Sequence, residues 1–264
     1  MLLRETGFTF RGKHSYRDMG LIYAEKDGHP NTPKVRWNTY EAAGVDGTLI
    51  FPGETRGTMS FDGTLYPVRE RPTQAEAQQL LREVSAWLSG GRGQLIFDYE
   101  PDKYYVAELG KESKWSLKNW FGGEISVSFT AQPWARSVNL DGVIIDMDTA
   151  NASVIMEAVT GAPCPVQIVI TNTGSADITG VSVQDGAVAL SGMQLAPGQT
   201  LTIDGEPPVG AAITASGETA SAMMYATAFR QILVENGANQ ILLNLTFGSG
   251  TKGAEVIVGY RGKW

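Results

Sequence analysis

The sequence lacks the features that mark several large classes of protein. Among its 264 residues there is one cysteine, Cys164, which excludes an intrachain disulfide and a cysteine-rich metal site and is typical of folding in a reducing cytoplasm. No run of about 18 apolar residues occurs, so we expect no transmembrane helix and no membrane insertion. The net charge is −7 and there is no basic run, which argues against nucleic-acid binding. With 42% apolar and 19% charged residues, the composition is that of a folded soluble protein.

Residues with catalytic or metal-binding potential are also few. His14 and His29 are the only histidines, and neither has a nucleophile or further ligands in a recognisable context. We therefore expect both to be solvated surface residues. The glycines from Gly90 to Gly93 follow a predicted helix, whereas a phosphate-binding loop precedes one. The sequence thus predicts no catalytic residue, no metal site and no cofactor.

Three carboxylates, Asp98, Glu100 and Asp102, alternate along one expected strand and the turn that follows it. This pattern has two interpretations, a calcium or glycosidase site and a solvated acidic turn around Pro101. The acidic turn explains the three residues without any chemistry, so we assign no catalytic role to them.

Short apolar runs separated by turn residues are abundant. There are 31 glycines, and this pattern favours a mainly β fold with many turns. One helix is expected from about Gln74 to Leu88, because Thr73 can cap its first turn and Glu76 completes a capping box. Its apolar residues follow helical spacing and predict a helix that packs on a sheet.

Strands are expected throughout the first half of the chain. Phe8 and Phe10 alternate on one face of a short strand, Gly12 permits a turn, and Leu21 to Tyr23 begin a second strand. Asp46–Gly47 is a hairpin-turn signal, since both residue types tolerate positive φ. The other expected strands are Lys34–Tyr40, two within Thr58–Val68 joined by a turn at Asp62–Gly63, Gln94–Asp98, Lys103–Leu109 and a strand within Gly123–Gln132.

The composition changes character near Pro133–Val138. Residues 1–135 hold 16 Lys and Arg against 17 Asp and Glu, whereas residues 136–264 hold 5 against 11. We therefore expect two domains, residues 1–135 and 136–264. The second half contains apolar or alternating runs bounded by turns, which suggest two packed antiparallel sheets in a jelly-roll-like sandwich. These runs are Val143–Met147, Val166–Thr171, Ile178–Val183, Thr200–Asp204, Gln240–Thr246 and Glu255–Tyr260.

Several of these segments, in the same order, resemble the distal tail proteins (Dit) of siphophages, the long-tailed phages with non-contractile tails. The stretch Phe8–Tyr23 is similar to the start of that family, and Leu95–Phe97 with Pro101–Tyr105 is similar to its apolar strand, Pro-Asp turn and Tyr-rich strand. Further similar segments are Asp46–Gly47, Pro52–Gly53, Pro133–Trp134, Leu195–Asp204, Asn239–Ile241 and Tyr260–Trp264.

The resemblance implies a mainly β chain, with an N-terminal β-sandwich bearing one α-helix and a C-terminal jelly-roll β-sandwich similar to galectins and carbohydrate-binding modules. It implies a structural protein of the virion, made in the host bacterial cytoplasm and placed at the distal end of the tail. There it would form a homo-hexameric ring that joins the tail tube to the tail tip. The implied partners are the tail tube protein, a tail-tip hub protein of the tail-associated lysin type, and a receptor-binding protein or host-surface glycan.

A ring requires subunit contacts, and two segments are candidates for them. One is the basic and hydroxylic stretch that follows Gly12, and the other is the Gly44–Pro67 hairpin region. The candidate contact residues are Lys13, Tyr16, Arg17, Asp18, Asp46, Leu49, Phe51, Arg56 and Tyr66.

Two other functions compete with the ring component. A carbohydrate-binding adhesion module would rest on the second half, where the aromatic residues available for sugar stacking are Tyr225, Phe229, Phe247, Tyr260 and Trp264. A cell-wall hydrolase of the tail tip would need a catalytic constellation, and the sequence has none that we recognise.

Overall fold

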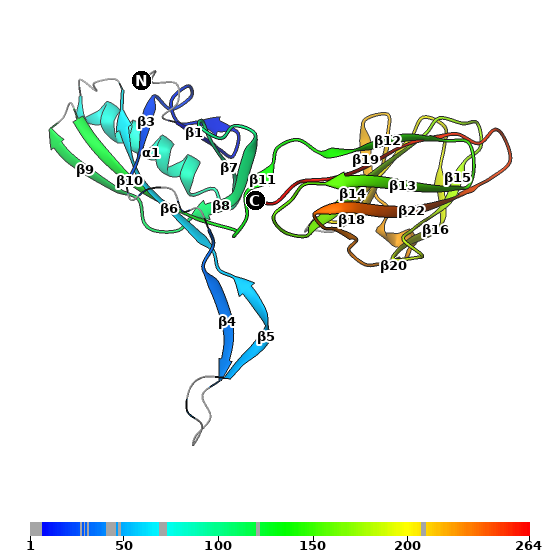
Figure 1. Ribbon diagram of the computed structural model, residues 1–264. Helices are drawn as coiled ribbons and strands as arrows, with labels where there is room; N and C mark the ends of the chain where they lie inside the picture. Colours follow the sequence, from blue (N-terminus) through cyan, green and yellow to red (C-terminus); the bar gives the residue numbers. More distant parts are fainter. Residues whose placement is uncertain are drawn as a thin grey trace. The chain divides into compact units, whose positions relative to one another are not determined.

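The computed structural model describes residues 7–26, 28, 30, 32–40, 46, 49–68, 73–119, 122–206 and 210–264. The chain divides into two compact units, Met1–Val138 and Asn139–Trp264 (Figure 1). Composition placed the domain boundary after residue 135. In the structure Arg136–Ser137 form a short strand, β11, that pairs with β8 (Lys103–Leu109) of the first unit.

The first unit is built on one nine-stranded antiparallel sheet. Its strand order is β2-β1-β7-β8-β10-β6-β3, with β11 paired to β8 and β9 paired to β10. The remaining bounds are β1 Phe8–Phe10, β2 Lys13–His14, β3 Leu21–Glu25, β6 Met59–Pro67, β7 Gly93–Phe97, β9 Lys114–Asn119 and β10 Gly122–Ala131.

This sheet folds over on itself around an aromatic core. In a flat sheet β1 and β3 would lie about 24 Å apart, because five steps of about 4.8 Å separate them. Instead, the ring centroids of Phe8 on β1 and Tyr23 on β3 are 5.2 Å apart. Phe8 also contacts Phe129 on β10, at 5.2 Å, and Trp87 of the helix, at 5.5 Å. The two halves of the sheet therefore form the layers of a sandwich.

The helix α1, Gln74–Leu88, is the only α-helix among the described residues and has the predicted bounds. The Thr73 hydroxyl accepts a hydrogen bond from the Glu76 N–H at 3.3 Å, which confirms the predicted N-cap. Leu80, Val84 and Trp87 are buried, and the Trp87 indole N–H donates to the Phe10 carbonyl at 2.8 Å. The helix thus covers the aromatic core and is tied to β1.

The prediction of two strands joined at Asp62–Gly63 is wrong, because β6 runs through both residues and pairs with β10 without a break. Gly63 is needed for a different reason. A Cβ at this position would lie 2.2 Å from Cε2 of Tyr23, whose ring crosses the strand. Burial raises the pKa of the Tyr23 phenol above its usual range, with smaller contributions from Glu25 and Asp62. The glycine therefore marks a close side-chain approach within a strand.

We expect Gly63→Ala to lower the free energy of unfolding by about 1–3 kcal/mol, because the added methyl group overpacks a filled core. In a Tyr23→Leu background the same change should cost almost nothing, since the colliding ring atoms are gone. Gly210→Ala is the matched control, because a Cβ there meets no atom within 4 Å. Chemical denaturation checks this, and equal losses from both alanine variants would contradict it.

The second unit is a sandwich of two antiparallel sheets. The seven-stranded sheet has the order β12-β23-β14-β17-β18-β19 with β21 paired to β14, and the five-stranded sheet has the order β13-β22-β15-β16-β20. Apolar residues of both sheets form one core. The bounds are β12 Asp141–Met147, β13 Asn151–Ala158, β14 Cys164–Asn172, β15 Ile178–Val183, β16 Val188–Leu195, β17 Thr200–Asp204, β18 Gly210–Ala215, β19 Glu218–Ser221, β20 Ala226–Phe229, β21 Leu233–Val234, β22 Gly237–Phe247 and β23 Ala254–Tyr260.

The predicted fold class is therefore confirmed: the described part of the chain is mainly β, with antiparallel sheets and one α-helix. The six strands expected in the second half are present, although several are longer than predicted. Within the described ranges, no helix is long and apolar enough to cross a membrane.

Candidate functional site

The structure separates the candidate contact residues into two groups at opposite ends of β6. Tyr66 pairs with Ile22 at one end, where the Val68 N–H also donates to the Gly20 carbonyl, close to the turn that holds Tyr16 and Arg17. At the other end β6 follows β5 (Leu49–Arg56), which carries the second group. Since β6 has nine residues, the two groups lie roughly 25–30 Å apart along the strand.

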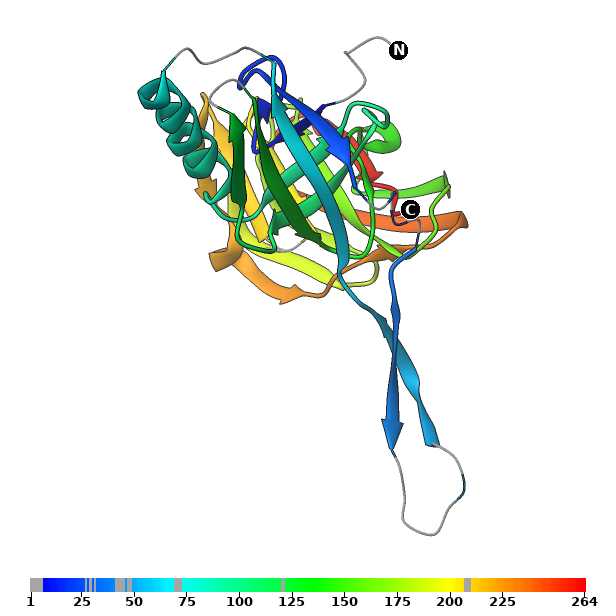
Figure 2. The ribbon, with the colours of Figure 1, turned by 90° about the vertical axis from the view of Figure 1, so that its left-hand side faces the viewer.

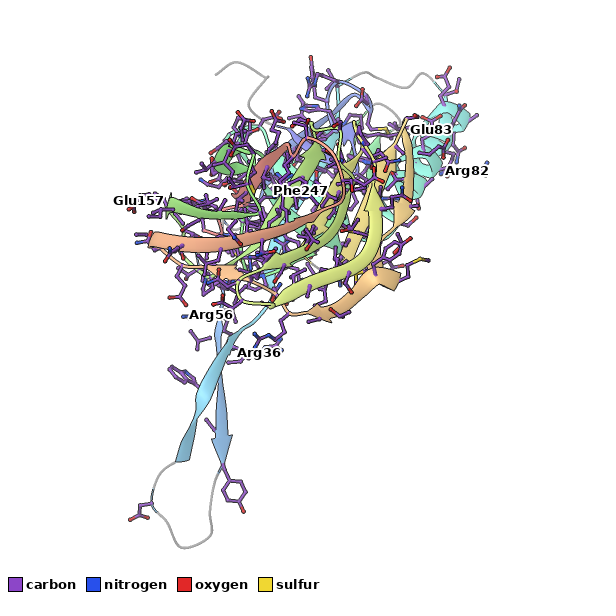
Figure 3. The ribbon with its side chains drawn as sticks, turned by 90° about the vertical axis from the view of Figure 1, so that its right-hand side faces the viewer. Arg36, Arg56, Arg82, Glu83, Glu157 and Phe247 are labelled. Atoms are coloured by element: carbon purple, nitrogen blue, oxygen red, sulfur yellow. The ribbon has the colours of Figure 1, made fainter. Side chains whose placement is uncertain are left out.

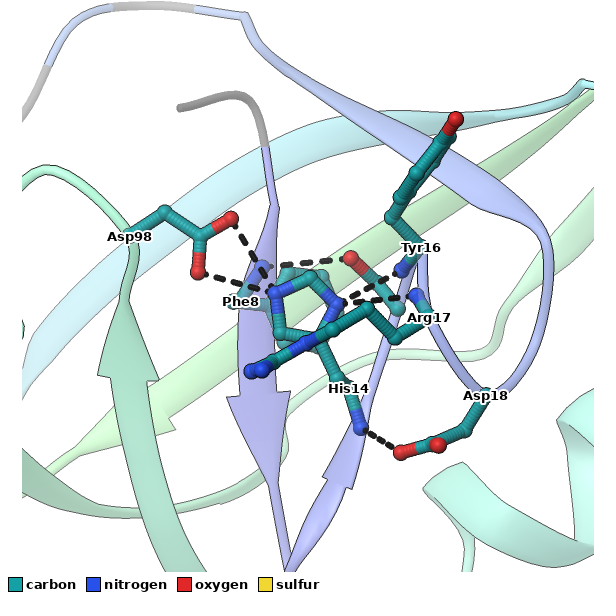
Figure 4. A network of polar contacts seen from close by, with 7 residues as sticks. Phe8, His14, Tyr16, Arg17, Asp18 and Asp98 are labelled. Carbon is teal, nitrogen blue, oxygen red and sulfur yellow. Dashed lines mark hydrogen bonds and ion pairs between the residues drawn. The ribbon is translucent and has the colours of Figure 1, made fainter. Parts of the chain in front are cut away.

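The first group is positioned by a polar network that we call the His14 clasp (Figure 4). Nε2 of His14 lies 2.9 Å and 3.1 Å from the two carboxylate oxygens of Asp98, which follows β7. Nδ1 accepts the backbone N–H groups of Tyr16 and Arg17, at 3.0 Å and 3.1 Å. Because Nδ1 accepts two hydrogen bonds, the proton of the neutral ring sits on Nε2 and is donated to Asp98.

Two further contacts complete the clasp. The His14 backbone N–H donates to the Asp18 carboxylate at 2.7 Å, and the Phe8 N–H donates to the Ser15 hydroxyl at 3.1 Å. Gly7 leaves room for the network, because a Cβ there would lie 2.6 Å from the Asp98 carboxylate. The turn after β2 is thus fixed to both β1 and the end of β7.

The prediction that His14 is a solvated surface residue is wrong, because its side chain is buried, with 6% of its surface exposed. Its partner Asp98 is 84 positions away in the sequence, so no local pattern could have revealed the pair. His29 lies outside the described residues.

The clasp is suited to positioning and not to catalysis. Both ring nitrogens of His14 are occupied, one by Asp98 and the other by backbone N–H groups. Neither is left to activate a nucleophile. What the clasp does is hold Lys13, Arg17 and Asp18 at the surface, where all three are exposed, with Tyr16 half-buried beside them.

The other carboxylates of the acidic turn serve local structure. Lys103 Nζ lies 2.9 Å from Glu100, and this hydrogen bond raises the pKa of the lysine. Asp102 lies 3.9 Å from the same amine. In the described part of the chain, no group of three or more His, Cys, Asp or Glu residues could hold a metal ion.

The second group lies on a two-stranded arm formed by β4 (Val35–Tyr40) and β5. Among the strands that the structure describes, these two pair only with each other, and they extend away from the other strands of the first unit (Figures 1 and 2). Arg36 and Arg56 are exposed at its base (Figure 3). Asp46 is exposed beyond the strands, while Leu49 and Phe51 are on β5 with side chains outside the described set.

The arm exposes apolar side chains that the rest of the first unit does not cover. Trp37 is 54% exposed and Tyr40 is 60% exposed. A two-stranded hairpin standing alone is marginally stable in water at best. Aromatic and arginine side chains are also the residues most enriched in the centres of protein interfaces. The arm therefore has the composition of a surface that packs against another protein.

The comparisons with known proteins agree with this view of the fold. No family model and no curated protein sequence matches the chain. Among solved structures, the fold is that of a hub protein of a phage adsorption apparatus. One match is the crystal structure of SPP1 Dit (gp 19.1), described as a paradigm of the hub adsorption apparatus in phages that infect Gram-positive bacteria. It covers 98% of each chain with a TM-score of 0.63 and 13% sequence identity, so it establishes a common fold over the full length.

Proposed function

We propose that this chain is a structural component of a phage tail, a distal tail protein that forms a closed ring at the end of the tail tube. The observation that carries the proposal is the fold shared with SPP1 Dit over 98% of both chains, through both units. The sequence motifs that resemble distal tail proteins support it independently. The role is structural and not catalytic, and the virion is the site of action.

The two candidate surfaces support a ring as the form of assembly. Copies related by rotation about one axis make heterologous contacts, in which one face of a subunit meets a different face of its neighbour. The arm with Trp37 and Tyr40 is one such face. The surface held by the His14 clasp, with Arg17 and Tyr66, is the other. Their separation along β6 allows one copy to contact two neighbours at once.

Six copies and the tail partners follow from the resemblance to distal tail proteins. In this proposal one face of the ring meets the tail tube protein, and the opposite face meets a tail-tip hub protein of the tail-associated lysin type. A receptor-binding protein is a further partner. The first unit is near charge balance, as suits a domain whose surface is largely covered, whereas the acidic second unit suits a solvated one.

Sedimentation velocity at increasing protein concentration tests the proposal, followed by electron microscopy with a tail-tube partner. We expect a species of six times the mass of one chain, alone or on the tube. The double variant Trp37→Ser with Tyr40→Ser should shift the population to monomer, because it removes the exposed aromatic surface of the arm. The effect should be at least tenfold in the concentration needed for assembly.

Ile155→Ser is the matched control, because Ile155 is an exposed apolar residue of the second unit. It should assemble like the unaltered protein. A chain that stays monomeric at every concentration and also fails to form rings with tail tubes would refute the proposal. Rings that the arm variant forms as readily as the control would refute the assigned contact.

A further inference from the structure

Strand β13 (Asn151–Ala158) forms an open edge of the five-stranded sheet in the second unit. It pairs with β22 along its whole length without a bulge, and no strand that the structure describes pairs with its other side. An edge strand presents a row of backbone N–H and carbonyl groups with which another extended chain can pair. Which of these groups point outward follows from the register of the two strands.

The hydrogen bonds at the start of β13 fix this alternation. The Leu245 N–H donates to the Ala150 carbonyl at 2.7 Å, so residue 150 faces β22 and every second residue after it does the same. The Asn151 carbonyl accepts the Thr149 hydroxyl at 3.1 Å instead of a group of β22. The odd-numbered residues of β13 therefore direct their backbone groups away from β22.

The centre of the strand follows the same alternation. Leu242 lies opposite Ser153, yet its N–H donates to the Gln184 side chain and its carbonyl accepts the Gln184 N–H. Neither backbone group of Leu242 bonds to β13, so those of Ser153 face outward, as do those of Ile155 and Glu157. Among the described residues, nothing makes a hydrogen bond to the backbone groups of these three residues.

This edge carries few of the devices that keep edge strands from pairing, which are short length, bulges, lysine and proline. β13 has 8 residues, contains no Lys, Arg or Pro, and has Glu157 as its one charged residue. The other edge strands of this unit are better protected. β19 and β20 have 4 residues each, and β12 carries both Asp141 and Asp146. β13 is therefore the edge most open to an added strand.

The side chains at this edge define the pattern that an added strand needs. Ser153, Ile155 and Glu157 are exposed on the outer face of the sheet. On the inner side, Ala152 is half-buried against the core, as is Ile145 of β12, the edge strand of the facing sheet that leads into β13. Since side chains alternate along a strand, a partner should place apolar residues toward Ala152 and Ile145 and polar residues on the outer face.

The charge around the edge indicates the chemistry of the partner. Residues 137–229 contain no Lys or Arg, and exposed acids stand near both ends of β13, Asp148 before it and Glu157 within it (Figure 3). Residues 139–264 hold 4 Lys and Arg against 11 Asp and Glu, so two copies of this unit repel each other. A strand with Lys or Arg on its outer face meets opposite charge instead.

We propose that β13 binds an extended, basic peptide segment of another protein, which joins the five-stranded sheet as an additional antiparallel strand. Main-chain hydrogen bonds to Ser153, Ile155 and Glu157 supply the affinity, and alternate Lys or Arg side chains beside the acidic edge supply the selectivity. β13 belongs to neither contact surface of the proposed ring. This inference therefore goes beyond that assembly and does not depend on it.

Hydrogen exchange of the full chain with the peptide Ac-KVKVKVK-NH₂ tests the proposal, read residue by residue by mass spectrometry with electron-transfer fragmentation. In the free protein the amides of Ser153, Ile155 and Glu157 should exchange fast, whereas those of Val154 and Met156, which face β22, should exchange slowly. Saturating peptide should slow the three outward amides at least about tenfold and leave the other two nearly unchanged. Slow exchange of the outward amides in the free protein would mean that a second copy already covers the edge, and would overturn the proposal.

Two methylated peptides separate strand addition from simple attraction of charge. The lysines of the bound peptide lie on the outer face, opposite the outward residues of β13, so their backbone groups make the new hydrogen bonds. N-methylation of three lysines should abolish binding of the fluorescein-labelled peptide, measured by fluorescence polarisation. N-methylation of the three valines should weaken binding by less than about threefold from a dissociation constant on the order of 0.1–1 mM. Equal binding of the two methylated peptides would refute strand addition.

Glu157→Lys tests the charge of the edge. It should weaken binding of Ac-KVKVKVK-NH₂ about tenfold, because a cation then lies among the lysines of the peptide. Glu218→Lys is the matched control, since it makes the same change of charge on β19, the far edge strand of the other sheet. It should weaken binding by less than about threefold, because the solvent screens distant charges.

The acidic peptide Ac-EVEVEVE-NH₂ should bind the unaltered chain at least about tenfold more weakly than the basic one. Equal effects of the two lysine variants would contradict the assigned edge, and a basic peptide that shows no saturable binding would overturn the proposal as a whole. None of these readouts requires a ring, so failure here is distinct from failure of the proposed assembly.

Discussion

Phe8→Ala should lower the free energy of unfolding of the first unit by about 3–5 kcal/mol, the range for truncating a fully buried phenylalanine. Phe8 has no exposed surface, and the rings of Tyr23, Trp87 and Phe129 surround it. These rings come from two strands of the folded sheet and from α1. Removing the phenyl group therefore leaves a cavity where three elements meet, and none of them can close it alone.

Tryptophan fluorescence during urea denaturation reports mainly on the unfolding of the first unit. Five of the six tryptophans, Trp37, Trp87, Trp115, Trp120 and Trp134, belong to the first unit. Phe8→Leu should lower the free energy of unfolding by less than half as much as Phe8→Ala, because leucine keeps most of the volume of the buried side chain. Tyr40→Ala is the control. It removes an exposed ring of the same unit and should change the free energy of unfolding by no more than about 0.5 kcal/mol. A Phe8→Ala loss below about 1 kcal/mol would contradict the central position assigned to this ring.

The second large effect is expected at the His14 clasp. His14→Ala leaves the Asp98 carboxylate and the N–H groups of Tyr16 and Arg17 without their partner. Each buried polar group that loses its partner costs about 1–3 kcal/mol, and partial hydration of this site reduces the sum. We expect a loss of about 2–4 kcal/mol, measured by the same fluorescence transition.

Two variants separate the charge of the clasp from its hydrogen bonds. Asp98→Asn keeps an acceptor for the Nε2 hydrogen of His14 but removes the negative charge. Its free energy of unfolding should therefore fall by less than that of His14→Ala. Lys13→Ala changes the exposed neighbour of His14 and should be nearly neutral. If the three variants were equally stable, the clasp would have no role in holding the turn.

The elements that the sequence predicted well are those whose causes are local. The bounds of α1 follow from Thr73, Glu76 and an apolar stripe, all within the helix or next to it. The strands β15 and β17 have the predicted bounds because turn residues flank each apolar run. In contrast, β13 was missed, since Met156, Glu157 and Ala158 have no strand preference and its order comes from pairing with β22.

The features that the sequence could not supply depend on distant partners. Gly63 was interpreted as a turn because the ring that requires a glycine, Tyr23, is forty positions away. The burial of His14 has the same kind of cause, because its partner Asp98 is 84 positions away.

The closure of the first sheet has a consequence for how the chain is made. Phe129, which packs against Phe8, is synthesised about 120 residues after it. At synthesis rates of about 5–20 residues per second, this delay is about 6–24 s. During that time Phe8 and Phe10 have no core to enter, and β1 has no β7 to pair with until residue 97 is made. The nascent chain therefore carries the apolar Phe8–Phe10 segment without its core through most of the synthesis of the first unit. We expect molecular chaperones to bind this segment during that time.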